Sequence, residues 1–157
     1  FNVKTDKSLS VEEDLSRRDG TFNAIAMDVE TGEFIDPFDG IGDLQRKVIK
    51  AVRDPYERFE EDPLRILRFV QFASRFKFSI EEKTFEAMKM KAETVLTCAS
   101  ERIHAEFMKA FEKSDSTETL CEILIESGLD HVLFGDDFDP MSYNISEEVV
   151  QSTSFLY

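Results

Sequence analysis

The clearest hydrophobic pattern in the chain lies between positions 60 and 76. On a helix at 100° per residue, its apolar residues fill one broad side and its charged residues form one narrow stripe. The broad side consists of Ile66, Leu67, Phe69, Val70 and Ala73, and the charged stripe of Glu61, Arg65, Arg68 and Arg75 with Phe72 among them. A helix that is apolar around most of its circumference is buried. We therefore predict a core helix from about Glu61 to Phe76, with Arg65 and Arg68 facing a cleft.

The start of this predicted helix is acidic. Pro63 suits a first helical turn, where no N–H partner is needed, and the acidic run 60–62 suits the positive end of the helix dipole. Arg65 lies four residues after Glu61 and three after Asp62. This spacing also permits plain salt bridges along a helix surface, so a purely structural role is the alternative to a binding role.

Three further helices are predicted after position 76, and capping residues mark their ends. The expected helix starts are Ser79 paired with Glu82, then Ser100, then Asp115 or Ser116, and the expected end of the last helix is Gly128. The side chains expected in the core are Phe85, Met88, Met90, Ile103, Phe107, Ala110, Phe111, Leu120, Ile123, Leu124 and Ser127. Residues 135–139 predict an acidic turn, and residues 142–157 give a weak helical signal.

The residues before position 55 show shorter, mixed signals. Ser10 and Glu13 form a capping-box pattern for a short helix. Strands are predicted at 1–4, at 24–28 and 33–36 as a β-hairpin around the turn 30–32, and at 48–52 as the closing strand of a small sheet. The predicted fold class is therefore α+β, a small sheet with short helices followed by an all-helical part.

Composition permits a real core but argues against strong binding of nucleic acid. The 157 residues are 41% hydrophobic and include 15 Phe and no Trp, so the chain is not disordered by composition. The net charge is −14, and residues 100–157 alone hold 3 Lys/Arg and 13 Asp/Glu. An acidic surface repels phosphate backbones, so this chain alone should bind nucleic acid weakly unless it has one local basic groove.

Cysteine usage favours a reducing compartment. Cys98 and Cys121 show no CxxC or metal-ligand spacing, and without a signal-peptide pattern they predict reduced, buried thiols in a cytoplasmic protein. No apolar run approaches the length needed to span a membrane. The chain begins at Phe1 and not at Met, which favours a fragment or a processed piece.

Four motifs in order resemble one enzyme family, the class II tRNA nucleotidyltransferases, or CCA-adding enzymes, together with the related bacterial poly(A) polymerases. RRDGTFNA at Arg17–Ala24 is similar to the family pattern RRDFTINA, and DPFDGIGDL at Asp36–Leu44 to DPFGGxxDL. EDPLRILR at Glu61–Arg68 and ERIHAE at Glu101–Glu106 match intact. Each motif alone is weak, but four in the right order are specific. The resemblance covers about residues 8–113.

The resemblance implies a domain order and a cofactor. Residues 1–55 would be the later part of the nucleotidyltransferase head, 56–113 the helical neck with the nucleotide-reading helix, and 114–157 the start of the helical body. The family reaction uses Mg²⁺ to activate the RNA 3′ hydroxyl and to stabilise the leaving pyrophosphate. A DxD pair after a GS-type turn, which would bind that metal, is not found, so we assign no metal ligand and no catalytic residue here. This chain alone is expected to be inactive.

The chemistry of base selection suits the motif at 61–68. Cytosine and adenine both present an amino donor beside a ring-nitrogen acceptor, whereas uracil and guanine present the reverse order. A carboxylate beside a guanidinium fits the first order and clashes with the second. By resemblance, Asp62 would accept from the amino group and Arg65 would donate to the ring nitrogen. CTP and ATP are the implied nucleotides, and tRNA is the implied partner of the complete enzyme.

The resemblance also implies roles for the residues around this pair. Arg18 and Arg68 would bind the nucleotide's phosphates or nearby groups, and Asp19 and Asn23 would hold its sugar. Three positions depart from the family pattern, namely Gly20 in place of a bulky residue, Asp39 in place of a glycine, and Gln71 in place of a third arginine. Phe22 is expected to refill the space that Gly20 leaves.

Three functions remain open from the sequence. The first is a partial tRNA nucleotidyltransferase that adds C and A with base selection by Asp62 and Arg65. The second is a poly(A) polymerase of the same family, which also keeps EDPLRxLR. The third is a non-catalytic helical module that retains the fold for protein contacts, which the motif departures and the acidic carboxy-terminal part favour.

Overall fold

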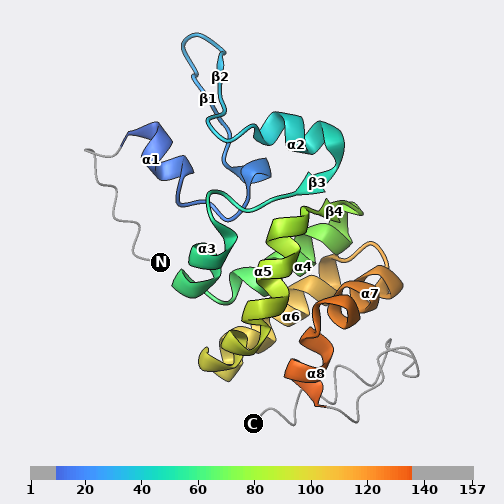
Figure 1. The fold of residues 1–157 in the computed structure, drawn as a ribbon. Coiled ribbons are helices and arrows are strands. Elements are labelled where there is room, and N and C mark those ends of the chain that lie inside the picture. Colours follow the sequence, from blue (N-terminus) through green and yellow to red (C-terminus); the bar gives the residue numbers. More distant parts are fainter. Residues whose placement is uncertain (1–9, 136–157) are drawn as a thin grey trace.

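The computed structural model describes residues 10–135 and confirms the α+β fold (Figure 1). The amino-terminal part contains α1 (Val11–Leu15), the 3₁₀ helix η1 (Thr21–Asn23), β1 (Ala26–Met27), β2 (Phe34–Ile35), α2 (Gly40–Arg46) and β3 (Val48–Ile49). The helical part contains α3 (Pro55–Glu61), α4 (Arg65–Phe76), β4 (Ser79–Ile80), α5 (Glu82–Lys91), η2 (Ala92–Thr97), α6 (Ser100–Lys113), α7 (Thr117–Ser127) and α8 (Leu129–Phe134). The predictions for residues 1–4, 136–139 and 142–157 lie outside the described residues.

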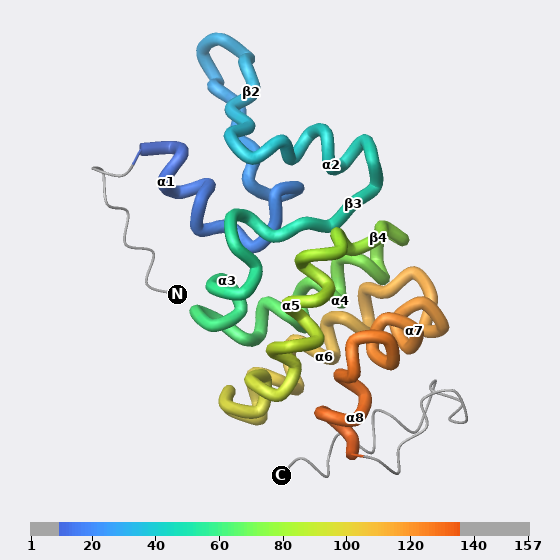
Figure 2. Tube along the Cα trace, viewed as in Figure 1, coloured from blue at the N-terminus to red at the C-terminus, as the bar shows by residue number. Residues whose placement is uncertain are grey.

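Local signals in the amino-terminal part are confirmed. The side chains and backbone N–H groups of Ser10 and Glu13 bond reciprocally, which makes the capping box that starts α1. β1 and β2 pair antiparallel as a hairpin, which projects away from the helices in Figure 2. The Asp28 carboxylate accepts from two N–H groups of the hairpin turn, at 2.8 and 3.2 Å. Gly32 takes the left-handed conformation with φ 73°, which glycine adopts without steric cost.

The strand predicted at 48–52 is present as β3, in a separate sheet of two strands. Its partner is β4, which runs parallel to it with Val48 aligned to Ser79. α3 and α4 form the crossover between the two strands, as a parallel pair requires. An antiparallel bridge between Gly20 and Ala51 joins the segment after α1 to the chain just after β3. The segment is thereby brought next to the helical part.

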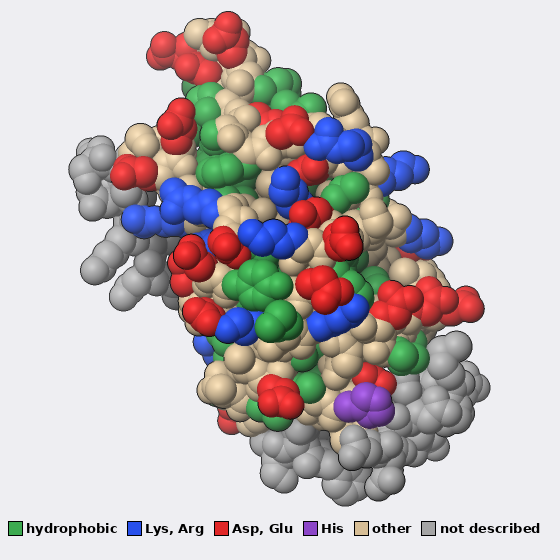
Figure 3. Space-filling view, viewed as in Figure 1, with side chains coloured by type: hydrophobic (Ala, Val, Ile, Leu, Met, Phe, Trp, Pro, Cys, Tyr) green, Lys and Arg blue, Asp and Glu red, His purple; other side chains and the backbone are tan. Residues whose placement is uncertain are grey.

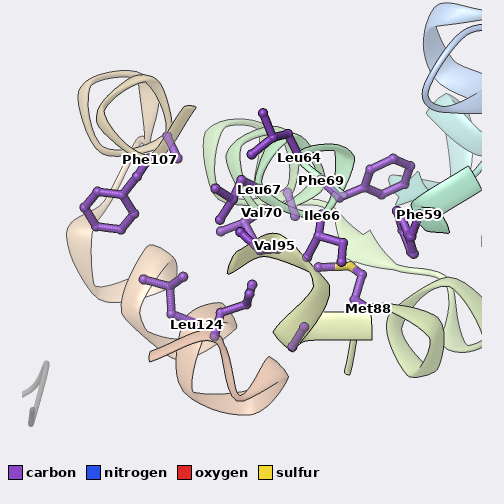
Figure 4. Packing of buried hydrophobic residues seen from close by; sticks show 14 of the residues in the cluster. Phe59, Leu64, Ile66, Leu67, Phe69, Val70, Met88, Val95, Phe107 and Leu124 are labelled. Atoms are coloured by element: carbon purple, nitrogen blue, oxygen red, sulfur yellow. The ribbon is translucent and has the colours of Figure 1, made fainter. Parts of the chain in front are cut away.

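α4 is the core helix of the molecule. The predicted apolar side is confirmed, because Ile66, Phe69, Val70 and Ala73 are 0% exposed and Leu67 is 1% exposed. Figure 4 shows side chains of α3, α4, α5, α6 and α7 converging on one cluster, with Phe59 close to Phe69. Their rings meet edge to face with centroids 5.5 Å apart. The position of α4 is therefore set by burial on most of its circumference.

The predicted start of this helix is wrong. The acidic run 60–62 does not begin α4, because α3 ends at Glu61 and Asp62 is its extended C-cap, with φ −150° and ψ 97°. A residue before proline avoids the helical region, so Pro63 ends the first helix and does not open the second. Asp54 and Pro55 open α3 instead, with the Asp54 carboxylate accepting from a backbone N–H two residues on. The motif EDPLRILR at 61–68 therefore spans a break between two helices.

The later helices are present, but two of their predicted caps are wrong. Ser116 caps α7 and the left-handed Gly128 ends it, as predicted. Ser79 does not cap α5, because it is paired within β4, and Glu81 takes the cap instead. α6 begins at Ser100 with Ala99 as its N-cap, so the Ser100 hydroxyl has no capping role.

The predicted core residues of these helices are buried or half-buried with one exception. Met90 is 71% exposed, whereas Met88 is fully buried. Residues two positions apart on a helix, such as Met88 and Met90, differ by about 200° around its axis, so one of them faces the core and the other faces outward.

Cys121 is buried and Cys98 is half-buried, and both are free thiols. Burial raises the pKa of the Cys121 thiol. Among the described residues no helix is long and apolar enough to cross a membrane.

Candidate functional site

Asp19 joins the segment after α1 to the charged stripe of α4. Its carboxylate accepts from Nε of Arg65 at 2.9 Å through one oxygen and from Nε of Arg68 at 2.9 Å through the other. Nη2 of Arg68 adds a third bond at 3.1 Å. The side chains of Asp19, Arg65 and Arg68 are 19%, 12% and 21% exposed. This partly desolvated, bidentate geometry makes the ion pairs stronger than surface pairs.

Asp62 lies beside this group, at the break between α3 and α4. Its carboxylate accepts from Nη2 of Arg68 at 2.9 Å and from the backbone N–H of Leu64 at 3.3 Å. Burial raises the pKa of Asp62, but the hydrogen bond and positive charge of Arg68 outweigh it, so the pKa lies below its usual value. Asp62 is therefore a carboxylate at neutral pH.

Arg65 has both anchored and available donors. Nη1 donates to the backbone oxygen of Arg58 at 2.9 Å and to the Glu61 carboxylate at 3.1 Å. The Glu61–Arg65 pair foreseen as a plain salt bridge is thus present, whereas Asp62 pairs with Arg68 and not with Arg65. Nη2 of Arg65 has no hydrogen-bond partner within residues 10–135. The guanidinium is therefore held through Nε and Nη1, and Nη2 is its one nitrogen without a bond to the described residues.

The structure gathers four of the six predicted binding residues, Asp19, Asp62, Arg65 and Arg68. The other two predicted residues are not bonded to this group. Arg18 is exposed and pairs with Asp14 in α1 at 3.0 Å. Asn23 uses its side-chain oxygen to accept from the backbone N–H of Gly20 at 3.2 Å, which holds the turn around η1. Both residues lie close to Asp19 in the sequence, but neither side chain is bonded to the cluster.

Gly20 is matched by an aromatic side chain, as expected. A Cβ at Gly20 would overlap the ring of Phe22, so the ring fills the space that a larger residue would need. Phe22 in turn packs edge to face on Phe72 of α4, with centroids 4.8 Å apart. This departure from the family pattern is therefore accommodated by packing between the segment after α1 and the core helix.

The motif at 36–44 forms the turn into α2. The Asp36 carboxylate accepts from the backbone N–H groups of Gly40 and Ile41 at 2.7 and 2.9 Å. Asp39 adopts the left-handed conformation, with φ 58°, that a glycine would take without strain. A hydrogen bond from Arg46 lowers the pKa of Asp39, so its added negative charge is paired.

Sequence reasoning missed Arg58. This arginine of α3 is buried, and it lines a polar cavity of about 410 Å³ together with Glu13, Ser16, Arg17, Arg53 and Glu61. Burial, and then the positive charge of Arg65, lower its pKa. An arginine three residues before a glutamate in a short helix resembles an ordinary surface pair, so the local pattern gave no signal for its burial.

Two family models match the chain. One, described as the poly A polymerase head domain, matches residues 2–50. The other, described as a probable RNA and SrmB-binding site of polymerase A, matches residues 77–139. The CCA-adding enzyme of Ligilactobacillus salivarius is 46% identical over 115 residues, 73% of this chain and 28% of that protein. That of Streptococcus uberis is 51% identical over 102 residues, 65% of this chain and 25% of that protein.

The chain belongs to the CCA-adding enzyme and poly(A) polymerase family. Solved structures of CCA-adding enzymes have the same fold. The enzyme of Bacillus stearothermophilus in complex with CTP superposes with a TM-score of 0.74 at 40% identity, covering 80% of this chain and 31% of that one. The enzyme of Thermotoga maritima, complexed with tRNA, gives 0.73 at 30% identity, covering 82% and 32%. This chain therefore spans about a third or less of the four relatives named here.

The metal that the family implies is not accommodated by the described residues. Within residues 10–135, no three His, Cys, Asp or Glu side chains gather into a group that could hold a metal ion. The acidic residues of the site are paired with arginines: Asp19 with Arg65 and Arg68, Asp62 with Arg68, and Glu61 with Arg65. The expectation that the metal ligands of a CCA-adding enzyme lie outside this chain stays a prediction.

Proposed function

We propose that this chain forms the nucleotide-selecting part of a template-independent RNA nucleotidyltransferase that adds C and A to the 3′ ends of tRNA. The observation that carries the proposal is the geometry at the break between α3 and α4. Asp62 and Arg65 lie there within one turn of chain, one as an ionised acceptor and the other with a free donor. The relatives named above as CCA-adding enzymes support this choice of reaction.

Asp62 and Arg65 select the base by the order of their hydrogen-bonding groups. The Asp62 carboxylate offers more lone pairs than its two present partners use, so it accepts from the amino group of cytosine or adenine. Nη2 of Arg65 donates to the adjacent ring nitrogen. Uracil and guanine would place a carbonyl against the carboxylate and an N–H against the guanidinium. Each opposed contact costs a few kcal/mol, on the order of a hundredfold in selectivity.

The other residues of the site bind or hold the rest of the nucleotide. Arg68 keeps Asp62 ionised and oriented through its 2.9 Å bond. Arg18, exposed beside the cluster, is the proposed contact for phosphates, and Asp19 and Asn23 are the proposed contacts for the sugar. Asp19 would do so while keeping its bonds to Arg65 and Arg68, because a carboxylate has about four acceptor positions.

Addition of A alone is the second candidate activity. It is favoured by the match of residues 2–50 to a poly A polymerase head. A complete enzyme carrying these residues, given tRNA that lacks its 3′ end, should incorporate both CTP and ATP and reject UTP and GTP. Incorporation of ATP alone would instead assign poly(A) addition, and indifference to the base would overturn the proposed selection.

We also propose that this chain alone transfers no nucleotide. The reason is that a GS-type turn followed by a DxD pair is not found in its sequence. Incubation with radiolabelled CTP or ATP, Mg²⁺ and tRNA lacking its 3′ end should give no incorporation above a heat-killed control. Signal clearly above that control, lost in a variant carrying Asp62→Ala, would show that the chain is catalytic by itself.

Binding of RNA by this chain alone should be weak. The net charge is −14, and the face in Figure 3 shows acidic and basic side chains interspersed, without a continuous basic surface. A filter-binding titration with tRNA at physiological salt should not saturate at low micromolar concentration. Tight binding that weakens steeply as salt is raised would contradict this expectation and would point to the arginines around the cavity beside Arg58.

A further inference from the structure

Arg58 connects the two chain segments that form the site. Its side chain is 7% exposed, and Nη2 donates to the backbone oxygens of Arg17 at 2.7 Å and Arg18 at 3.1 Å. Nη1 pairs with the Glu61 carboxylate. The two carbonyls immediately precede Asp19 in the chain. Arg58 therefore fixes the backbone from which the Asp19 carboxylate extends toward α4.

The backbone of Arg58 also holds Arg65. Its carbonyl accepts a hydrogen bond from Nη1 of Arg65 at 2.9 Å. Both arginines also form an ion pair with the carboxylate of Glu61. One residue thus bonds to both sides of the Asp19–Arg65 ion pair, whose members are 46 positions apart in the chain. A planar guanidinium can reach two carbonyls and a carboxylate at once, which a lysine ammonium on a flexible stem cannot reproduce.

Packing alone does not explain a cation at this position. Nε of Arg58 is buried without a hydrogen-bond partner among the described residues, and the nearby charges of Arg65 and Arg53 repel it. Burying an imperfectly paired charge is unfavourable, and an apolar residue of similar volume is often as stable or more so. The bonds to the segment before Asp19 are what an apolar residue could not make.

We propose that Arg58 is a positioning residue for base selection: it holds Asp19 against Arg65 and Arg68, and so presents the free donor of Arg65 beside Asp62. The proposal rests on the proposed function. Arg58 itself does not touch the nucleotide. Its loss should therefore leave a folded protein in which the ion pairs of Asp19 are loosened and the preference for cytosine over uracil is reduced.

The first experiment uses the free chain. Exchange of the Nε–H protons of Arg65 and Arg68 with solvent is measured by nitrogen-15 NMR in wild type, Arg58→Met, Arg58→Lys and the control Arg75→Lys. Arg75 is an exposed arginine of α4, the helix that also contains Arg65 and Arg68. In both Arg58 variants we expect exchange about tenfold faster or more, with no change in the control. Unchanged exchange in folded Arg58 variants would overturn the proposal.

The second experiment adds nucleotide. The ratio of the dissociation constants for UTP and CTP, measured by NMR titration, should fall about tenfold or more in Arg58→Met and Arg58→Lys and stay unchanged in Arg75→Lys. A fall in melting temperature with the ratio unchanged would mean that Arg58 is only structural. If the wild type shows no preference between the nucleotides, the proposed function fails, and the exchange data on the free chain still decide the positioning role.

A third measurement needs no variant of Arg58. In the wild type, the Nη protons of Arg58 should exchange slowly, because both nitrogens are bonded to fixed partners in a buried position. Slow exchange supports the proposal even if both variants fail to fold. Fast exchange, like that of the exposed Arg75, would show that Arg58 does not hold the segment before Asp19.

Discussion

Replacing Phe69 by alanine should lower the free energy of unfolding by about 3–5 kcal/mol, as for other buried aromatic residues. The Phe69 ring is fully buried in α4 and packs edge to face on Phe59, so its loss removes both apolar burial and an aromatic contact. The cavity would lie within the main hydrophobic cluster, beside Phe59 of α3. Urea unfolding followed by circular dichroism measures the change.

Arg68→Ala is the matched variant on the opposite side of the same helix, and it should cost less, about 1–2 kcal/mol, because its ion pairs are only partly buried. Asp19 would keep its bond to Arg65, and Asp62 would keep its bond to a backbone N–H. Equal losses for Phe69→Ala and Arg68→Ala would mean that the charged stripe of α4 is mainly structural. Family membership alone would then support a binding site on this helix.

Changing Asp62 or Arg65 in a complete enzyme that carries this segment should alter base choice by on the order of a hundredfold. Asp62→Ala removes the acceptor for the exocyclic amino group, so rejection of UTP and GTP should weaken. Arg65→Ala removes the donor to the ring nitrogen, so incorporation of CTP and ATP should slow as well. Arg65→Lys keeps the charge but loses the planar fork, so it should resemble the alanine variant.

The measurement is kcat/KM for all four nucleotides in each variant. The double variant Asp62→Ala with Arg65→Ala should be non-additive, because the two residues lie within one turn and share Arg68 and Asp19 as a network. Arg75→Ala, on the exposed part of α4, is the control and should leave the four values unchanged. An equal loss for all four nucleotides would show that the pair is not a base template.

Local and periodic features of the fold could be predicted from the sequence. The buried side of α4 could be predicted because Ile66, Phe69 and Ala73 recur with the helical period of 3.6 residues, and an apolar stripe of this kind packs into the core. The caps at Ser10 and Ser116 involve bonds within three residues, so short-range pattern is enough to identify them. Four of the six predicted binding residues come together because the fold brings the motif at 17–24 against the motif at 61–68.

Non-local features could not be predicted in the same way. β3 pairs with β4 across two helices, and no local pattern indicates that partner. Asp62 bonds to Arg68 and not to Arg65, because the break before α4 displaces it from the helical spacing that the prediction assumed. The burial of Arg58 depends on carbonyls about 40 residues earlier in the chain. In each case the deciding contact is distant in sequence and close in space.

The most direct test of the central claim is the affinity of the chain for the four nucleotides. NMR titration of the wild type with CTP, ATP, UTP and GTP gives dissociation constants even when binding is weak. We expect CTP and ATP to bind with similar affinity and more tightly than UTP and GTP, by on the order of a hundredfold, with the largest shifts at Asp62 and Arg65. Four dissociation constants within about twofold of one another, or shifts confined to residues away from the break between α3 and α4, would contradict base selection by this pair.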